Sequence, residues 1–278
     1  MEVKGNKTKQ EGAPKPTKER AMAFLKSKGF KNAVLTVLYP LISLAVVLLV
    51  WLIAAKSLDK PLVLPEPKEA LRELFIILGE KQIYEYGAMT VGRSFLSFIL
   101  SAAFAFLFSI IGVLFKPFHK VMSPIVTVLR AAPTLPVIFL AVIWFDYAEV
   151  PVVIGFLIAF PLLYSSFYTA LTGVDKNLVD MAKSFNVSKK NVILYVYLPS
   201  IRKPCLESMK SVISLTLKVV VAAEITALTK KSLGLLFRIE NLTYNISALL
   251  ALTVFTVIIS FILEGIFSLI IWATGKVR

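Results

Sequence analysis

The feature that most constrains this chain is an uncharged run of 23 residues, 33–55. A helix of about 20 apolar residues crosses a bilayer, where only a segment that satisfies its own backbone polar groups is stable. The apolar core of a cleavable signal peptide has only about 7–15 residues, so we interpret this run as a membrane span. The whole chain is 57% hydrophobic, with a mean hydropathy of +0.78, against about 45–50% apolar residues in soluble domains. The sequence therefore predicts an all-α integral membrane protein.

Polar loops divide the rest of the chain into further apolar segments. Six spans are expected in one transmembrane domain, residues 33–278, behind a basic tail at residues 1–32. Basic segments stay in the cytoplasm during membrane insertion, which assigns the tail and the loops 116–120 and 173–205 to that side. Both termini are then cytoplasmic, and the net basic loop 230–245 is the one exception to the rule. The predicted spans are residues 33–55, 88–113, 121–145, 150–171, 206–229 and 246–274.

Composition excludes several kinds of function. The net charge of +14 lies mainly in the tail and the cytoplasmic loops, which indicates membrane insertion and contact with lipid rather than nucleic acid. Cys205 and His119 are the only cysteine and histidine, so a single chain forms no intramolecular disulfide, no Cys- or His-based metal cluster and no histidine-centred triad. Neither a G-x-x-x-x-G-K-[ST] phosphate loop nor an H-E-x-x-H or G-x-S-x-G motif occurs. We therefore expect no enzyme activity, no cofactor and no metal site in this chain.

The third predicted span is irregular, because it holds Pro124, Pro133 and Pro136 around Arg130. Proline removes a backbone donor and clashes one turn back, and a broken helix at membrane depth must face protein or a water-filled cavity. A charge at that depth is costly unless it reaches polar surroundings. Arg130 is therefore either a snorkelling structural charge or a residue that lines a pathway. A pathway role would favour an anionic solute such as a sulfonate, nitrate or carboxylate.

The fifth predicted span also carries charges, Lys218 and Glu224. They are six residues apart, about 120° around a helix, so they are poor partners for one another. Each must find a partner on another helix or line a pathway.

Small residues recur at every fourth position of the span 88–113. Ser97, Ser101, Ala105 and Ser109 share one helix face, and small side chains let membrane helices approach closely. We interpret this face first as a packing surface, with pathway lining as the alternative.

The polar segment 175–199 predicts two short helices with a joint between them. Asp175 is a suitable N-cap, and Ser188 can cap the second helix, which Pro199 closes or restarts. Asn186 follows the first helix, where a left-handed residue often ends a helix. The first helix is amphipathic, and its apolar stripe is formed by Leu178, Met181, Ala182 and Phe185. Such a helix fits a groove on another protein, with attachment to lipid headgroups as the alternative.

This segment resembles the coupling motif of bacterial ABC-importer permeases, which is E-A-A, three residues, G, nine residues and I-x-L-P. The chain has Asp-Met-Ala at residues 180–182, Asn186 and Val-Tyr-Leu-Pro at residues 196–199, with the same spacing. Three letters of the motif differ: the Glu is replaced by Asp, the first Ala by Met, and the Gly by Asn. Asn is the residue best able to replace glycine in a left-handed conformation.

The resemblance covers most of residues 64–267 and is closest to the nitrate/sulfonate/taurine-type group of permeases. Residues 64–67 (L-P-E-P) resemble the L-P-S-P of that group. The third span is similar to its R-P-x-P-x-x-A-x-x-P-L-…-W-F-G pattern through Arg130, Pro133, Pro136 and Trp144-Phe145, with Asp146 in place of the last glycine. Glu224 and Ser232-Leu233-Gly234 are similar to its E…G-L-G, with the first glycine replaced.

The resemblance implies a type I ABC-importer permease, a multi-pass protein of the bacterial inner membrane. It implies a homodimer of permeases, an extracytoplasmic solute-binding protein, and two cytoplasmic ABC ATPases that bind ATP and Mg and dock on the 176–186 helices. The transported solute would be a small anion such as nitrate, a sulfonate or taurine, or a vitamin precursor. The docking residues would be Leu178, Asp180, Met181, Ala182, Phe185 and Asn186, and the pathway or gate residues Arg130, Pro133, Pro136, Lys218 and Glu224.

Two other classes of protein remain as alternatives. An ion-coupled secondary transporter or channel would use Arg130, Lys218 and Glu224 as its buried charges, but it leaves the polar segment unexplained. A receptor would use the amphipathic helix to recruit a signalling protein. Co-purification with an ATP-hydrolysing subunit would distinguish the importer from both.

Overall fold

The computed structural model describes residues 28–275 except 59 and 61, and the side chains of residues 28–37 and 275 are also outside the description. Most of the predicted basic tail therefore lies outside the described residues. The chain divides into two units, Met1–Pro67 and Lys68–Arg278, which we describe separately.

The first unit contains one long helix, α2 (Lys28–Leu58), which includes the first predicted span. From Leu38 to Leu58 this helix is long and apolar enough to cross a membrane. Most of its apolar side chains are exposed, as expected for a helix that faces lipid. The indole N–H of Trp51 donates to the carbonyl of Pro65 at 3.0 Å, so the chain after the helix turns back toward it.

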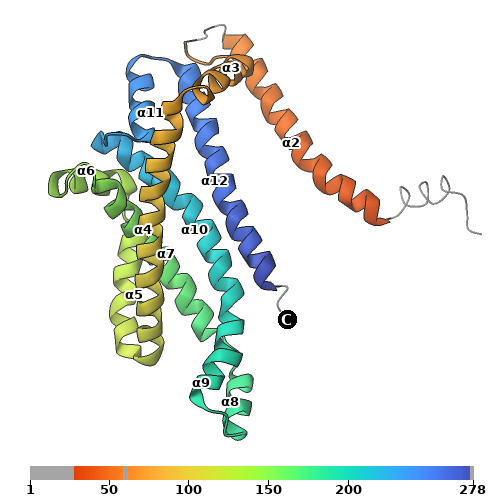
Figure 1. Cartoon of the computed structure of the whole chain (residues 1–278), viewed down its shortest axis with the longest axis vertical. Helices are drawn as coiled ribbons and strands as arrows, with labels where there is room; N and C mark the ends of the chain where they lie inside the picture. The colour runs from red at the N-terminus through yellow and green to blue at the C-terminus, as the bar shows by residue number, and fades with distance from the viewer. Residues whose placement is uncertain (1–27, 59, 61, 276–278) are drawn as a thin grey trace, which may run out of the picture. The chain divides into compact units, whose positions relative to one another are not determined.

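The described residues of the second unit form helices and connecting turns, without strands (Figure 1). This confirms the all-α prediction. The helices are α3 (Pro67–Leu78), α4 (Lys81–Leu114), α5 (Lys116–Ala131), α6 (Thr134–Trp144), α7 (Val150–Thr172), α8 (Lys176–Ser184), α9 (Lys189–Val192), the π-helical segment η1 (Ile193–Tyr197), α10 (Leu198–Ala227), α11 (Leu233–Leu242) and α12 (Ile246–Gly275).

Four of the described helices, α2, α4, α7 and α12, are long and apolar enough to cross a membrane. Helices α5 and α6 add a fifth span if they cross together, although they are bent by 100° relative to one another. Helix α10 is 30 residues long, but Lys210, Lys218 and Glu224 interrupt its apolar sequence. The count of six spans therefore stays a prediction.

The break between α5 and α6 has a local cause. Pro133 has no N–H to continue a helix, and a residue before proline is pushed out of the helical region. Accordingly, Ala132 is extended, with ψ of 131°. The irregularity predicted for residues 121–145 is thus a sharp corner. Helix α4 begins seven residues before its predicted start at 88, at Lys81, because polar residues extend the helix beyond its apolar part.

The core of the second unit lies between α4, α7 and α10. The small residues Ser97, Ser101, Ala105 and Ser109 of α4 are all fully buried, which confirms their packing role. A Cβ atom added to Gly155 of α7 would lie 2.7 Å from the Ser97 hydroxyl oxygen and 3.0 Å from a Val220 methyl group on α10. The three helices therefore approach one another too closely for a larger residue at this point.

Candidate functional site

The polar segment after α7 folds as its sequence predicts. The Asp175 carboxylate caps α8 by accepting a hydrogen bond from the backbone N–H of Asn177 at 2.8 Å. Asn186 ends the helix in the left-handed region with φ of 52°. The N–H of Val187 then donates to the carbonyl of Ala182 at 3.0 Å, a bond that commonly accompanies a left-handed helix end. The predicted cap and left-handed joint are confirmed.

The apolar stripe of α8 is largely uncovered in this chain. Ala182 is buried, whereas Leu178, Met181 and Phe185 are 43%, 54% and 78% exposed. On the polar face, Asp180 pairs with Lys183 at 2.9 Å, and both side chains are well exposed, so this pair contributes little to stability. The helix thus presents three large apolar side chains that are only partly covered by the described part of the chain.

A helical path links α9 to the membrane domain, and α8 joins it through the left-handed turn at Asn186. Ser188 caps α9 by accepting from the N–H of Asn191 at 3.4 Å, and α9 runs through η1 into α10. Pro199 is the second residue of α10, so it restarts the helix instead of closing it. Because proline lacks an N–H and clashes with the carbonyl one turn back, it accounts for the wider π turn before it, where the N–H of Leu198 donates to Ile193.

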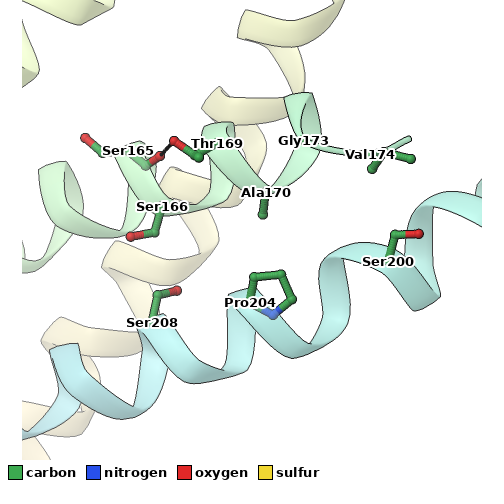
Figure 2. A pocket seen from close by; sticks show the side chains of 9 residues that line it. All are labelled: Ser165, Ser166, Thr169, Ala170, Gly173, Val174, Ser200, Pro204 and Ser208. Carbon is green, nitrogen blue, oxygen red and sulfur yellow. Dashed lines mark hydrogen bonds between the residues drawn. The ribbon is translucent and has the colours of Figure 1, made fainter. Parts of the chain in front are cut away.

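A cleft of about 540 Å³ lies between the second half of α7 and the first half of α10. Ser166 of α7 and Ser208 of α10 face one another across it (Figure 2). A second hollow, of about 360 Å³, shares Ser165, Ser166 and Ser208 with it and adds Arg130 and Ser211. We call the two together the hydroxyl cleft. The first hollow is lined by Ser165, Ser166, Thr169, Ala170, Gly173, Val174, Ser200, Pro204 and Ser208.

The serines of the cleft donate their hydroxyl protons to their own helices. Ser165 and Ser166 donate to the carbonyls of Pro161 and Leu162 at 2.9 and 3.0 Å, and Ser208 donates to that of Cys205 at 2.8 Å. These bonds satisfy the hydroxyls in an otherwise apolar helix surface. Rotation about one side-chain bond would redirect each hydroxyl proton toward a ligand in the cleft.

Arg130 lies in the last turn of α5, where a cation interacts favourably with the helix dipole. It is exposed, and within the described part of the chain no ion pair or hydrogen bond to its guanidinium is found. Pro133 is the N-cap of α6, and Pro136 lies in the first turn of that helix. The predicted gate prolines therefore form the corner that follows Arg130.

Glu224 has three partner residues on two other helices, α4 and α11. Its side chain is fully buried and forms an ion pair with Arg93 of α4 at 2.9 Å. It also accepts hydrogen bonds from the Thr90 hydroxyl at 2.8 and 3.1 Å and from the N–H of Gly234 at 3.3 Å. Lys218, by contrast, is exposed, and no ion pair holds it among the described residues. The structure thus does not join Arg130, Lys218 and Glu224 into one charged cluster.

The Arg93 guanidinium also holds the turn after α10. It donates to the carbonyls of Lys230 and Lys231 at 3.2 and 3.3 Å. Two residues of this turn, Leu228 and Lys231, are left-handed, with φ of 55° and 48°. Lys231 also pairs with Glu85 at 2.8 Å on the surface, which raises the pKa of the lysine.

Sequence reasoning missed Arg93 and Thr90. The signal for Arg93 was present, because it is the only charged residue in the predicted span 88–113. A charge inside a span requires a counter-charge, and Glu224 had no partner on its own helix. Thr90 carries no comparable signal.

This chain is similar to known proteins both in sequence and in fold. Residues 109–271 match the family model described as "Binding-protein-dependent transport system inner membrane component". The taurine transport system permease protein TauC of Escherichia coli (strain K12) is 27% identical over 229 residues, which cover 80% of this chain and 83% of the relative. The putative aliphatic sulfonates transport permease protein SsuC of Bacillus subtilis (strain 168) is 24% identical over 158 residues, 56% of this chain and 57% of the relative.

Solved structures share the fold. The MetNI methionine ABC transporter in an inward-facing conformation superposes with a TM-score of 0.57 at 14% identity, covering 69% of this chain and 94% of that chain. An amino acid ABC transporter superposes with a TM-score of 0.54 at 18% identity, covering 70% and 92%. These likenesses support the helical architecture of the second unit.

Proposed function

This chain belongs to the family of binding-protein-dependent transport system inner membrane components and is a permease subunit of an ABC importer, and on that premise we propose that it couples a cytoplasmic ATPase to the uptake of a small sulfonate. The family match spans the docking segment and the hydroxyl cleft. The names of two relatives, one for taurine and one for aliphatic sulfonates, support the choice of solute.

The observation that carries the coupling role is the uncovered apolar stripe of α8. An amphipathic helix with such a stripe suits a groove on a partner protein. Helix α8 follows α7 after a short turn, and a second short turn joins it to α9, which runs through η1 into α10. A displacement of α8 by an ATPase would therefore act on both walls of the hydroxyl cleft.

The remaining partners follow from the same proposal. ATP and Mg are bound by the ATPase dimer, since the chain has no phosphate loop. A second copy of the permease completes the pathway, and an extracytoplasmic solute-binding protein delivers the solute. The segment that contains α8 and both chain termini lies in the cytoplasm, in agreement with the basic loops.

The proposal is tested by changing the two faces of α8. Phe185→Asp and Asp180→Lys are expected to abolish both co-purification of the ATPase and solute uptake, with normal amounts of permease in the membrane. Lys176→Asp is the matched control for Phe185→Asp, because Lys176 is nine residues from Phe185 and lies on the opposite side of the helix. Normal uptake by both Phe185→Asp and Asp180→Lys would refute the docking role of this helix.

A further inference from the structure

The hydroxyl cleft has the size and lining of a small-ligand site. Its two hollows have volumes of about 540 and 360 Å³, within the range of about 300–1,000 Å³ that is usual for such sites. They share Ser165, Ser166 and Ser208, so the two hollows adjoin. The cleft lies between the docking segment and Arg130, and both of its walls are helices connected to α8.

Arg130 is the only ionisable side chain among the residues that line the cleft. It is nine residues from Val121, where the predicted span begins, which corresponds to about 14 Å along the helix in a hydrocarbon layer of about 30 Å. An arginine at this depth requires a polar or anionic partner, and the described chain gives its guanidinium none. The cleft therefore offers an unpaired cation to an anion.

The nearest carboxylate on the α10 wall belongs to Glu207. Glu207 lies one turn before Ser211, and the Ser211 hydroxyl donates to the backbone carbonyl of Glu207 at 3.3 Å. The Glu207 carboxylate lies 3.9 Å from the ammonium group of Lys203. Glu207 does not line either hollow. Along the exposed stripe of α10, Ser211 and Leu215 are followed one turn later by Lys218, so a second cation continues the same face.

On the basis of the proposed function, we infer that Arg130 and the serines of the hydroxyl cleft form a site that recognises the sulfonate group and makes no distinction between sulfonates with and without an amine. The guanidinium fork can donate to two oxygens of a sulfonate at once. Ser166 and Ser208, which face one another, can turn their hydroxyls from their own helices to the third oxygen. No carboxylate or aromatic ring among the lining residues is available to hold the ammonium group of taurine. Selection between sulfonates is then made before the solute reaches the permease.

The test is equilibrium binding of radiolabelled taurine and ethanesulfonate to the purified permease–ATPase complex in nanodiscs, without the solute-binding protein. The two ligands are expected to bind with affinities within about threefold of one another. Arg130→Gln should weaken both by at least about tenfold, and Arg130→Lys should weaken them less, because lysine keeps the charge but loses the fork. A combined Ser166→Ala and Ser208→Ala change should weaken both to an intermediate extent.

Lys120→Gln is the matched control, since it removes one exposed positive charge from the same helix outside the cleft. It is expected to leave both affinities unchanged, and co-purification of the ATPase shows that each variant is assembled. Unchanged binding in Arg130→Gln, or no sulfonate binding by the wild-type complex, would overturn the site. Binding of taurine without ethanesulfonate would overturn the indifference to the amine.

Uptake by the complete importer separates this inference from the function on which it rests. If the wild-type importer with its binding protein takes up neither sulfonate, the proposed solute class is wrong, and the site is refuted with it. If the wild type takes up sulfonates and Arg130→Gln does so at the same rate, the proposed function stands and the site alone is wrong.

Discussion

Replacing Arg93 with methionine is expected to destabilise the folded permease by about 3–5 kcal/mol, the usual cost of removing one partner from a buried ion pair. Glu224 is fully buried, and in this variant only the Thr90 hydroxyl and the Gly234 N–H would still donate to its carboxylate. The change also frees the carbonyls of Lys230 and Lys231.

The opposite change, Glu224→Gln, should cost less. Glutamine keeps an oxygen that accepts from Thr90 and Arg93, and the arginine is held by two carbonyls with 15% of its side chain exposed. We expect a loss of about 1–3 kcal/mol, typical of an impaired buried hydrogen bond. Combining Arg93→Met with Glu224→Met should cost less than the sum of the two single methionine changes, because no uncompensated charge remains.

The measurement is unfolding in mixed detergent micelles, followed by loss of the helical circular dichroism signal as the denaturing detergent is increased. Glu85→Gln is the matched control. It removes the exposed ion-pair partner of Lys231, which lies in the turn that Arg93 holds, and it should leave the transition within the scatter of the wild type. If Arg93→Met and Glu85→Gln shift the unfolding transition equally, the buried Arg93–Glu224 pair stabilises the fold no more than the exposed Lys231–Glu85 pair, and the reasoning is refuted.

Three further predictions concern the helix end at Asn186 and two close contacts between helices, at Gly234 and Gly155. Asn186→Val should weaken co-purification of the ATPase, because the left-handed conformation costs an ordinary residue about 1–2 kcal/mol but is tolerated by asparagine and glycine, whereas Asn186→Gly should keep it; equal loss in both would count against the joint. Gly234→Ala should lower the unfolding midpoint, since its Cβ would clash with the Cβ of Glu224 and lie 2.6 Å from the backbone nitrogen of Ile225. The control is Gly92→Ala, which has open space around it, and equal midpoints would refute the close approach. Gly155→Leu should reduce the folded fraction on size exclusion by separating α7 from α4, and a normal elution profile would contradict this.

The features that the sequence predicted correctly depend on local chemistry. The Asp175 cap and the left-handed Asn186 involve only neighbouring residues, so their side-chain preferences suffice. The small residues of α4 were predictable as a packing face because they share one side of a helix. Each of these features follows from spacing along one helix or from a single residue at its end.

The remaining features depend on residues that are far apart in the chain. Arg93 and Glu224 are separated by 131 positions. The sequence indicates that each charge requires a partner, but only the three-dimensional structure shows that they pair with one another. The hydroxyl cleft likewise appears only when α7 and α10 lie side by side, because each wall alone is a helix with ordinary serines. Pro133 predicted a break, but the 100° angle between α5 and α6 is determined by packing around it.

Helix α10 connects the three functional features of the described fold. Figure 1 shows α8 and α9 at one end of α10 and α11 at the other. At the α11 end, Glu224 is fixed to α4 by Arg93. At the α8 end, Pro204 lies inside the helix and leaves the carbonyl of Ser200 without its usual donor, which makes bending easier there. Because Ser200 and Pro204 also line the cleft, the proposed pull on α8 would bend α10 beside the proposed ligand site, while the Glu224 end would stay in place.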